Sequence, residues 1–307
     1  MSTREHVSPP GGTVPCATPA NVIPVDDVIA CATPTGDPSP SGPASAGDWP
    51  ADLPRPIREE PLDGGYIGRT TLATLADGRE VVVKRCPYPV DQEADGLAAL
   101  TAAGAPVPAV LGAAAHTLVL EFVTGDPDWA GLGRAVARLH RTVADRFGWP
   151  IPNFHGRFPQ DNTWTDTWPA FYVDRRVRPQ LARADLPTEL RTRIGTACDG
   201  PLRELLRPSP PASLTHGDLW PGNMIGGRAL VDPAVSHADR ELDLAYLSLS
   251  DSLPGEFLSA YEREYPVDPG FPERRPALLL HKHLVNVRHF GERSLPQLWA
   301  LLEHYGW

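Results

Sequence analysis

The segment LTHGDLWPGN, residues 214–223, constrains the fold of this chain more than any other, because polar side chains stand at fixed intervals between apolar runs. Asn223 lies five positions after Asp218, and Asp232 follows a short strand-like stretch. A loop of this length turns back on itself, so Asp218 and Asn223 face one cleft and Asp232 enters it from the next strand. We therefore expect two short strands flanking a polar loop.

Carboxylate and amide side chains in this arrangement suit phosphoryl transfer from a nucleotide to an alcohol. The reaction needs a carboxylate that orients the hydroxyl and accepts its proton, together with oxygen ligands that hold a metal ion against the phosphates. Asp218 is the predicted catalytic base, and Asn223 and Asp232 are the predicted ligands of Mg²⁺, which prefers hard oxygen donors. The alternative is that these acids cap turns at strand ends, as Asp often does.

The N-terminal half supplies the elements that such chemistry requires, and in the right order. Lys84 ends a β-branched strand about twenty residues after the glycine pair Gly64 and Gly65, where a kinase-like enzyme places the lysine that binds the α and β phosphates of ATP. Glycines there let backbone N–H groups approach the phosphates. The expected partner of Lys84 is Glu93, on a helix predicted to end at Gly104. A solvated lysine and an ordinary glycine turn are the alternatives.

Further along, a buried strand ends in a polar exit that we interpret as the connector between two lobes. Glu121, Phe122 and Val123 are predicted to present their backbone to adenine, although the same residues could form a buried strand end. The segments after residue 130 are mainly helical. The order predicts an α+β, bilobal, protein-kinase-like fold. Its parts are a disordered Pro/Ala/Ser-rich tail over 1–50, a small antiparallel β N-lobe over 51–122, and a larger helical C-lobe over 123–307.

Charge and composition exclude several other classes. The formal charge of −10 and a pI near 5.4 provide no basic surface for polyanions, so we expect neither nucleic acid nor a membrane as partner. The chain shows no apolar run long enough to span a membrane and no secretory signal, which favours a cytoplasmic location. Its four cysteines lack zinc-site spacing. There is no P-loop motif.

Two details narrow the type of kinase. A protein kinase needs a long activation segment after the metal-binding Asp, but here a predicted helix begins within ten residues of Asp232, which favours a small-molecule kinase. Within the loop, His216 is predicted first to hydrogen-bond the loop backbone. It is also assigned, with Trp220, to the substrate side of the site, where an aromatic face suits the C–H side of a sugar. A core tryptophan is the alternative for Trp220.

The loop HGDLWPGN, with Trp220 before the Asn, resembles that of the fructosamine kinase (ketosamine-3-kinase) family. Four further segments are similar to successive blocks of that family, so the resemblance extends from about Pro56 to the C-terminus; they are FGW at 147–149, PQDNTWTDTWPAFYVDRRVRPQL at 159–181, VDPAVSHADRELDLAYL at 231–247 and HKHLVNVRHFG at 281–291.

The resemblance implies ATP- and Mg²⁺-dependent phosphorylation of a ketosamine, a sugar attached to an amine by glycation, at its third carbon. The product is unstable and releases the amine, so the implied role is deglycation of glycated proteins, peptides or amino acids. It also implies Asp218 as base, Asn223 and Asp232 as metal ligands, and Lys84 with Glu93 as phosphate anchor. The alternatives are a kinase of another hydroxylated amine, such as an aminoglycoside or choline-like compound, and a catalytically inactive nucleotide-binding scaffold.

Overall fold

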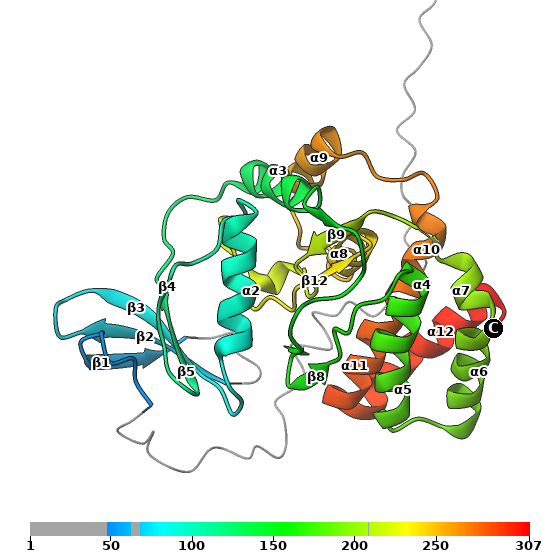
Figure 1. The fold of residues 1–307 in the computed structure, drawn as a ribbon, viewed down its shortest axis with the longest axis horizontal. Coiled ribbons are helices and arrows are strands. Elements are labelled where there is room, and N and C mark those ends of the chain that lie inside the picture. Colours follow the sequence, from blue (N-terminus) through cyan, green and yellow to red (C-terminus); the bar gives the residue numbers. More distant parts are fainter. Residues whose placement is uncertain (1–47, 63–67, 208) are drawn as a thin grey trace, which may run out of the picture.

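The computed structural model describes residues 48–62, 68–207 and 209–307, which form two lobes (Figure 1). Gly64 and Gly65, predicted to approach the phosphates, lie outside the described residues, as does most of the predicted tail. The smaller lobe is a sheet with one helix, and the larger lobe is mainly helical. This arrangement confirms the predicted bilobal α+β fold.

The N-lobe sheet is antiparallel and has five strands in the order β1-β2-β3-β5-β4. The alternation of buried and half-buried residues in β2 and β3 follows the two-residue period of a strand. A turn that contains Asp77 and Gly78 joins them, and Gly78 has a φ of +88°. The strands are β1 (Pro56–Pro61), β2 (Arg69–Leu75), β3 (Glu80–Arg85), β4 (Val110–Ala113) and β5 (Thr117–Glu121).

Strand β3 is the central strand of the sheet, and both of its faces are covered. Val81 and Val83 pack under Trp49, while Val82 faces the helix α2 (Asp91–Ala102), which contributes Leu97 to the second small core. Lys84 lies within this strand, one residue before its end at Arg85. Packing on both faces therefore fixes the position of the strand and of the Lys84 backbone.

Two features of this lobe differ from the prediction. Trp49 is buried in the sheet core, and Asp48 accepts hydrogen bonds from the His116 N–H and the Thr117 hydroxyl, so the folded part begins before the predicted boundary at residue 50. The strand β4 follows a stretch that contains Pro106 and Pro108, and no strand was predicted at its position. Its register shifts between Val110 and Gly112, so its pairing with β5 is not apparent from a regular apolar pattern.

The connector leaves β5 and enters α3 (Trp129–Leu139), which packs along α9 (Gly255–Glu264) at the top of the view in Figure 1. Beneath them lie short strands that carry the polar loops: β6 (Val143–Ala144), β9 (Ala212–Thr215) and β12 (Ser236–Ala238) form one sheet, while β7 (Asn153–His155) pairs with β8 (Phe158–Gln160), and β10 (Met224–Ile225) with β11 (Ala229–Leu230).

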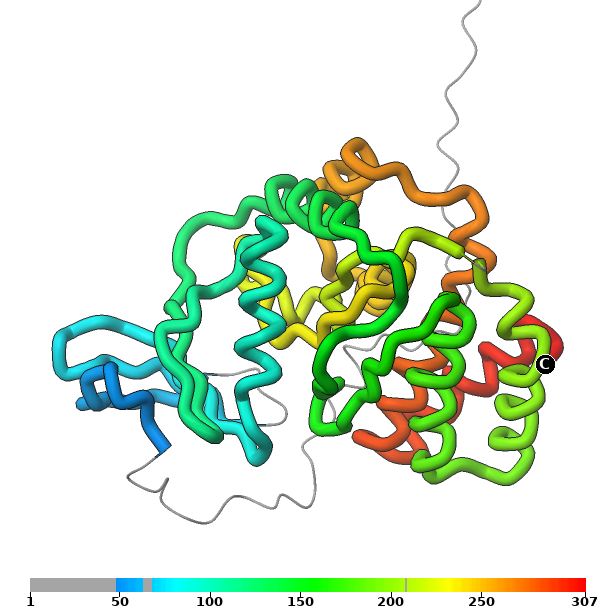
Figure 2. The backbone as a smooth tube through the Cα atoms, viewed as in Figure 1, coloured from blue at the N-terminus to red at the C-terminus, as the bar shows by residue number. Residues whose placement is uncertain are grey.

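The remaining helices gather around a core rich in aromatic side chains, and the chain path in Figure 2 brings the C-terminal helices back beside the segment that precedes β9. Trp168, Phe171 and Tyr172 are fully buried there. None of the described helices is long and apolar enough to cross a membrane. These elements are α4 (Trp168–Ala170), a π-helix (Phe171–Val177), α5 (Arg178–Arg183), α6 (Thr188–Asp199), α7 (Pro201–Leu205), α8 (Glu241–Leu247), α10 (Phe271–Leu278), α11 (Leu280–Phe290) and α12 (Leu295–Tyr305).

Candidate active site

The loop after β9 is held in place by a buried carboxylate. Asp243 of α8 accepts hydrogen bonds from the backbone N–H groups of His216 and Gly217, at 2.7 and 2.9 Å. Gly217 has a φ of +82°, and a Cβ there would lie 2.0 Å from the Ala234 carbonyl oxygen, so only glycine fits. The Asp243 carboxylate therefore fixes the backbone of the loop just before Asp218.

Asp243 also lies within hydrogen-bond distance of the His140 ring nitrogen Nε2, so it joins its helix both to the loop and to α3. Asp239 does accept the Glu241 N–H at 3.1 Å, as a cap would. In the sequence Asp243 stands between Leu242 and Leu244, and an acid buried among apolar residues needs several donors.

His216 has the backbone role that was predicted for it. The Asp218 N–H donates to its Nδ1 at 3.3 Å, and Nε2 lies 2.9 Å from the Val231 carbonyl, to which it donates. Burial lowers the pKa of this imidazole, which favours the neutral tautomer that these bonds require. Because the ring is fully buried and both nitrogens are occupied, the assignment of His216 to the substrate side was wrong.

Asp218, Asn223 and Asp232 come together as predicted. The Asn223 amide donates to the Asp218 carbonyl at 2.9 Å, and the Val231 N–H donates to the Asn223 carbonyl at 3.0 Å, which joins the loop to the segment that delivers Asp232. Asp232 has a φ of +56°, a left-handed conformation that Asp tolerates better than most residues and that often marks functional sites.

Lys84 reaches this cluster from the N-lobe. Its ammonium donates to Glu93, the predicted partner, and to Asp232 in the C-lobe. Although burial disfavours the charged form, the carboxylates of Asp232 and Glu93 hold the pKa of Lys84 above its ordinary value. The lysine stays protonated and connects the two lobes.

A second lysine, which was not predicted, lies on the other side of the loop. Lys282 of α11 donates to Asp218 Oδ1 at 2.5 Å and to the ring nitrogen Nε2 of His155 on β7 at 3.0 Å. The only available signal was its rarity, because Lys84 and Lys282 are the two lysines among 28 Lys and Arg residues. Both therefore contact acidic side chains of the candidate active site.

The oxygen donors of Asn223 and Asp232 suit Mg²⁺ bound together with phosphates. The Asp232 carboxylate is half-exposed, and the Asn223 side-chain oxygen accepts no hydrogen bond from any described residue. No cluster of three His, Cys, Asp or Glu side chains in the described part of the chain could hold a metal by itself. A carboxylate and an amide oxygen leave most coordination positions to water and phosphate, which is the usual preference of Mg²⁺.

Trp220 is half-buried and lies back over its own loop. A Cβ on Gly222 would be 2.1 Å from the Trp220 ring, so the indole can lie there only because residue 222 has no side chain. The predicted adenine segment, Glu121, Phe122 and Val123, forms the end of β5 and the start of the connector, and the latter two are half-buried. The sugar contact of Trp220 and the adenine contact of residues 121–123 stay predictions.

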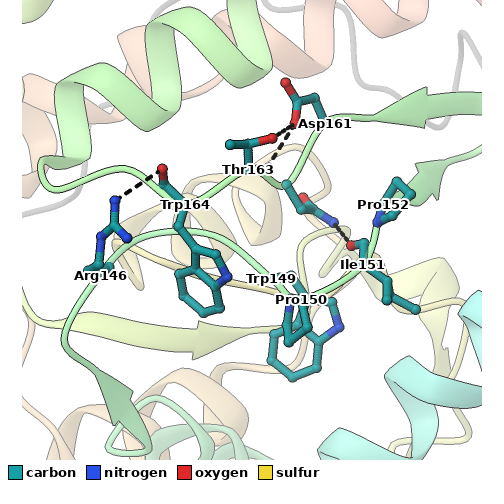
Figure 3. Close-up of a pocket in the computed structure, with 9 residues that line it drawn as sticks. Arg146, Trp149, Pro150, Ile151, Pro152, Asp161, Thr163 and Trp164 are labelled. Atoms are coloured by element: carbon teal, nitrogen blue, oxygen red, sulfur yellow. Dashed lines mark hydrogen bonds between the residues drawn. The ribbon is translucent and has the colours of Figure 1, made fainter.

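A separate cavity of about 630 Å³ lies between the loop after β6 and the segment after β8 (Figure 3). Trp149 and Trp164 line it, and Arg146 donates to the Trp164 carbonyl at its edge. Trp149 and Trp164 both contact the ring of His237, and none of the predicted site residues that the structure describes lines this cavity.

Taken together, the sheet lobe, the connector and the helical lobe define a phosphotransferase fold of the protein-kinase type. The model of the fructosamine kinase family matches residues 58–305, and the chain belongs to this family.

Individual relatives agree with this assignment. A Thermus thermophilus protein named probable ketoamine kinase is 34% identical over 249 residues, covering 79% of this chain and 92% of its own length. A Synechocystis protein with the same name is 35% identical over 198 residues, a match that spans 60% of this chain and 64% of that relative. The crystal structure of a Thermobifida fusca protein, described as a candidate fructosamine-3-kinase, superposes with a TM-score of 0.71 at 31% identity, covering 84% and 95% of the two chains.

Proposed function

We propose that this protein is an ATP- and Mg²⁺-dependent ketosamine kinase that phosphorylates the 3-hydroxyl of fructosamine- or ribulosamine-type adducts. One observation supports this most directly. In a chain of the fructosamine kinase family, Asp218, Asn223 and Asp232 lie within one loop system, and Lys84 contacts the last of them.

In the proposed reaction, the acceptor hydroxyl gives its proton to the Asp218 carboxylate while its oxygen bonds to the γ-phosphorus. The bond from that phosphorus to the β–γ bridging oxygen breaks, and ADP leaves with the electron pair. The proton then passes to solvent. Lys84 would bind the α and β phosphates, and Asn223 and Asp232 would hold Mg²⁺, which neutralises charge on the phosphates.

The biological consequence that we propose follows from the product. A phosphate on the third carbon of a ketosamine makes the adduct unstable, so the amine of a glycated protein, peptide or amino acid is released. Trp220 would then face the apolar side of the sugar. A cytoplasmic location stays a prediction.

The test is to incubate the purified protein with ATP and Mg²⁺ and one acceptor at a time: ribulose-lysine, fructose-lysine or an aminoglycoside. We expect ADP formation with a ketosamine and a 3-phosphorylated product identified by NMR. Turnover of the aminoglycosides alone would contradict the proposed substrate and retain the chemistry. Absence of turnover with every acceptor would contradict the proposed enzyme.

A further inference from the structure

Several carboxylates of this protein are held on both oxygens by one arginine. Arg274 donates to Glu241 through Nε and Nη2, at 2.8 and 2.7 Å. Arg85 binds the two oxygens of Glu59 in the same way, at 2.7 Å each. A planar guanidinium matches a carboxylate with two parallel hydrogen bonds, so an acid held in this way has little freedom to bind anything else.

Asp218 is held differently. Lys282 donates to Oδ1 alone, and no described residue donates a hydrogen bond to Oδ2. The side chains of Lys282 and Asp218 are only 11% and 15% exposed, so the ammonium is largely removed from water and retains its position. The contact holds Oδ1 in place and leaves Oδ2 without a donor among the described residues.

His155 completes this arrangement. It is fully buried, and burial and the positive charge of Lys282 hold its pKa well below the ordinary value. The neutral ring accepts a hydrogen bond from the Lys282 ammonium through Nε2, and it packs edge to face against His281 and Tyr246. Two fixed acceptors from different elements therefore define where the ammonium lies.

We propose that Lys282 is a positioning residue of the active site, which binds Asp218 Oδ1 so that Oδ2 alone faces the acceptor hydroxyl. The inference rests on the proposed role of Asp218 as base and assigns Lys282 to the acceptor side of the reaction, apart from the nucleotide side served by Lys84. His155 acts through Lys282 by holding its ammonium.

The choice of lysine follows from the same geometry. An ammonium is a compact donor that binds one oxygen, whereas a guanidinium at this place would bind both oxygens of Asp218, as Arg274 binds Glu241. A purely structural ion pair would tolerate arginine, because the charge is kept. A positioning role predicts that arginine fails.

The kinetic test compares Lys282→Met and Lys282→Arg with the wild-type protein in the full chain. We expect kcat on the accepted ketosamine to fall by roughly 10- to 100-fold in both variants, with the KM for ATP within about twofold of wild type, because catalytic geometry tolerates little displacement. The melting temperature of Lys282→Arg should stay near the wild-type value. Full recovery of kcat in Lys282→Arg, or a KM for ATP that rises while kcat is unchanged, would overturn the proposal.

A second measurement needs no turnover and applies if Lys282→Met fails to fold. With ¹⁵N-labelled lysine, the chain gives two side-chain ammonium signals, which Lys84→Arg assigns. We expect Asp218→Asn to shift the Lys282 signal and not the Lys84 signal, and ADP with Mg²⁺ to do the reverse. An unchanged Lys282 signal in Asp218→Asn would contradict the contact itself, whereas failure of the proposed function is seen separately, in the wild-type protein with every acceptor.

Discussion

The two lysine centres of this protein are built in different ways. Lys84 finds Glu93 nine residues further along the chain, on the helix that follows its own strand. Lys282 finds Asp218 and His155 at separations of 64 and 127 residues, on elements that the tertiary fold alone brings together. The pairing of Lys84 with Glu93 follows from the order of strand and helix, whereas both contacts of Lys282 require the packing of the C-lobe.

The centres also differ in charge. Lys84 contacts two carboxylates, those of Glu93 and Asp232, which leaves an excess of negative charge that suits Mg²⁺ and its phosphates. Lys282 contacts one carboxylate and a neutral imidazole, so its charges already balance. We assign the Lys84 centre to the nucleotide and the Lys282 centre to the acceptor. We infer that the nucleotide centre is completed by its ligands, whereas the acceptor centre is formed before any ligand binds.

We expect the largest effect on kcat from a substitution that removes the carboxylate of Asp218. Asp218→Asn should lower kcat by roughly 100-fold or more, because a positioned general base typically contributes that much. The KM for ATP should change little, since Lys84 and Asp232 stay in place. Steady-state kinetics on the accepted ketosamine checks this, with Asp185→Asn, at an exposed position, as the matched control. Near-normal turnover in Asp218→Asn would refute the base assignment.

The next effect tests the nucleotide centre. Lys84→Met should lower kcat/KM for ATP by about tenfold or more, because the phosphates lose their cation and the Glu93 carboxylate, which is 14% exposed, loses its partner. Titration calorimetry with ADP and Mg²⁺ should show the same loss. If binding of ADP is unchanged, the role of Lys84 is limited to joining the lobes.

These two centres show which parts of the site the sequence could predict. Lys84 with Glu93, and Asp218 with Asn223 and Asp232, lie at short spacings within two separate motifs, and the fold joins these motifs through the contact of Lys84 with Asp232. The contacts of Lys282 with Asp218 and His155 could not be predicted, because the strand of His155 and the helix of Lys282 each look like ordinary core elements in the sequence.

The fold shows the same division. The β2–β3 hairpin and α2 follow from alternation and turn residues, whereas β4, with its irregular register, does not. Trp49 was placed in the tail because its partners are tertiary. His216 was assigned to the substrate because the buried carboxylate that anchors its loop, Asp243, lies on a later helix.

A smaller effect concerns pH and is specific to the acceptor side, where His155, His281 and His283 are all buried. Burial lowers the pKa of His283 to about 4. Between pH 6.5 and about 4 the unfolded chain binds a proton at this position that the folded chain does not. Protonation of His283 therefore leaves the free energy of unfolding unchanged above pH 6.5 and lowers it as the pH decreases below that value. Each such histidine lowers the free energy of unfolding by about 1.4 kcal/mol per pH unit in this range.

Urea unfolding from pH 7 to 4.5 measures this slope. In His283→Asn the slope should decrease by about one proton, and in the exposed control His304→Asn it should match the wild type. An unchanged slope in His283→Asn would show that this histidine is protonated in the folded state, and the contrast between the acidic nucleotide centre and the histidine-rich acceptor side would weaken.

The smallest effect tests whether the acceptor side can be changed without the nucleotide side. Gly222→Ala places a methyl group where the Trp220 ring now lies, 2.1 Å from its nearest atom, so the indole must move away from the loop. We expect the KM for the ketosamine to rise by roughly three- to tenfold, about the cost of one lost apolar contact, with the KM for ATP unchanged. Tryptophan fluorescence should report the displacement. A displaced indole with an unchanged acceptor KM would assign Trp220 to packing, and Lys282 with Asp218 would then carry acceptor recognition without it.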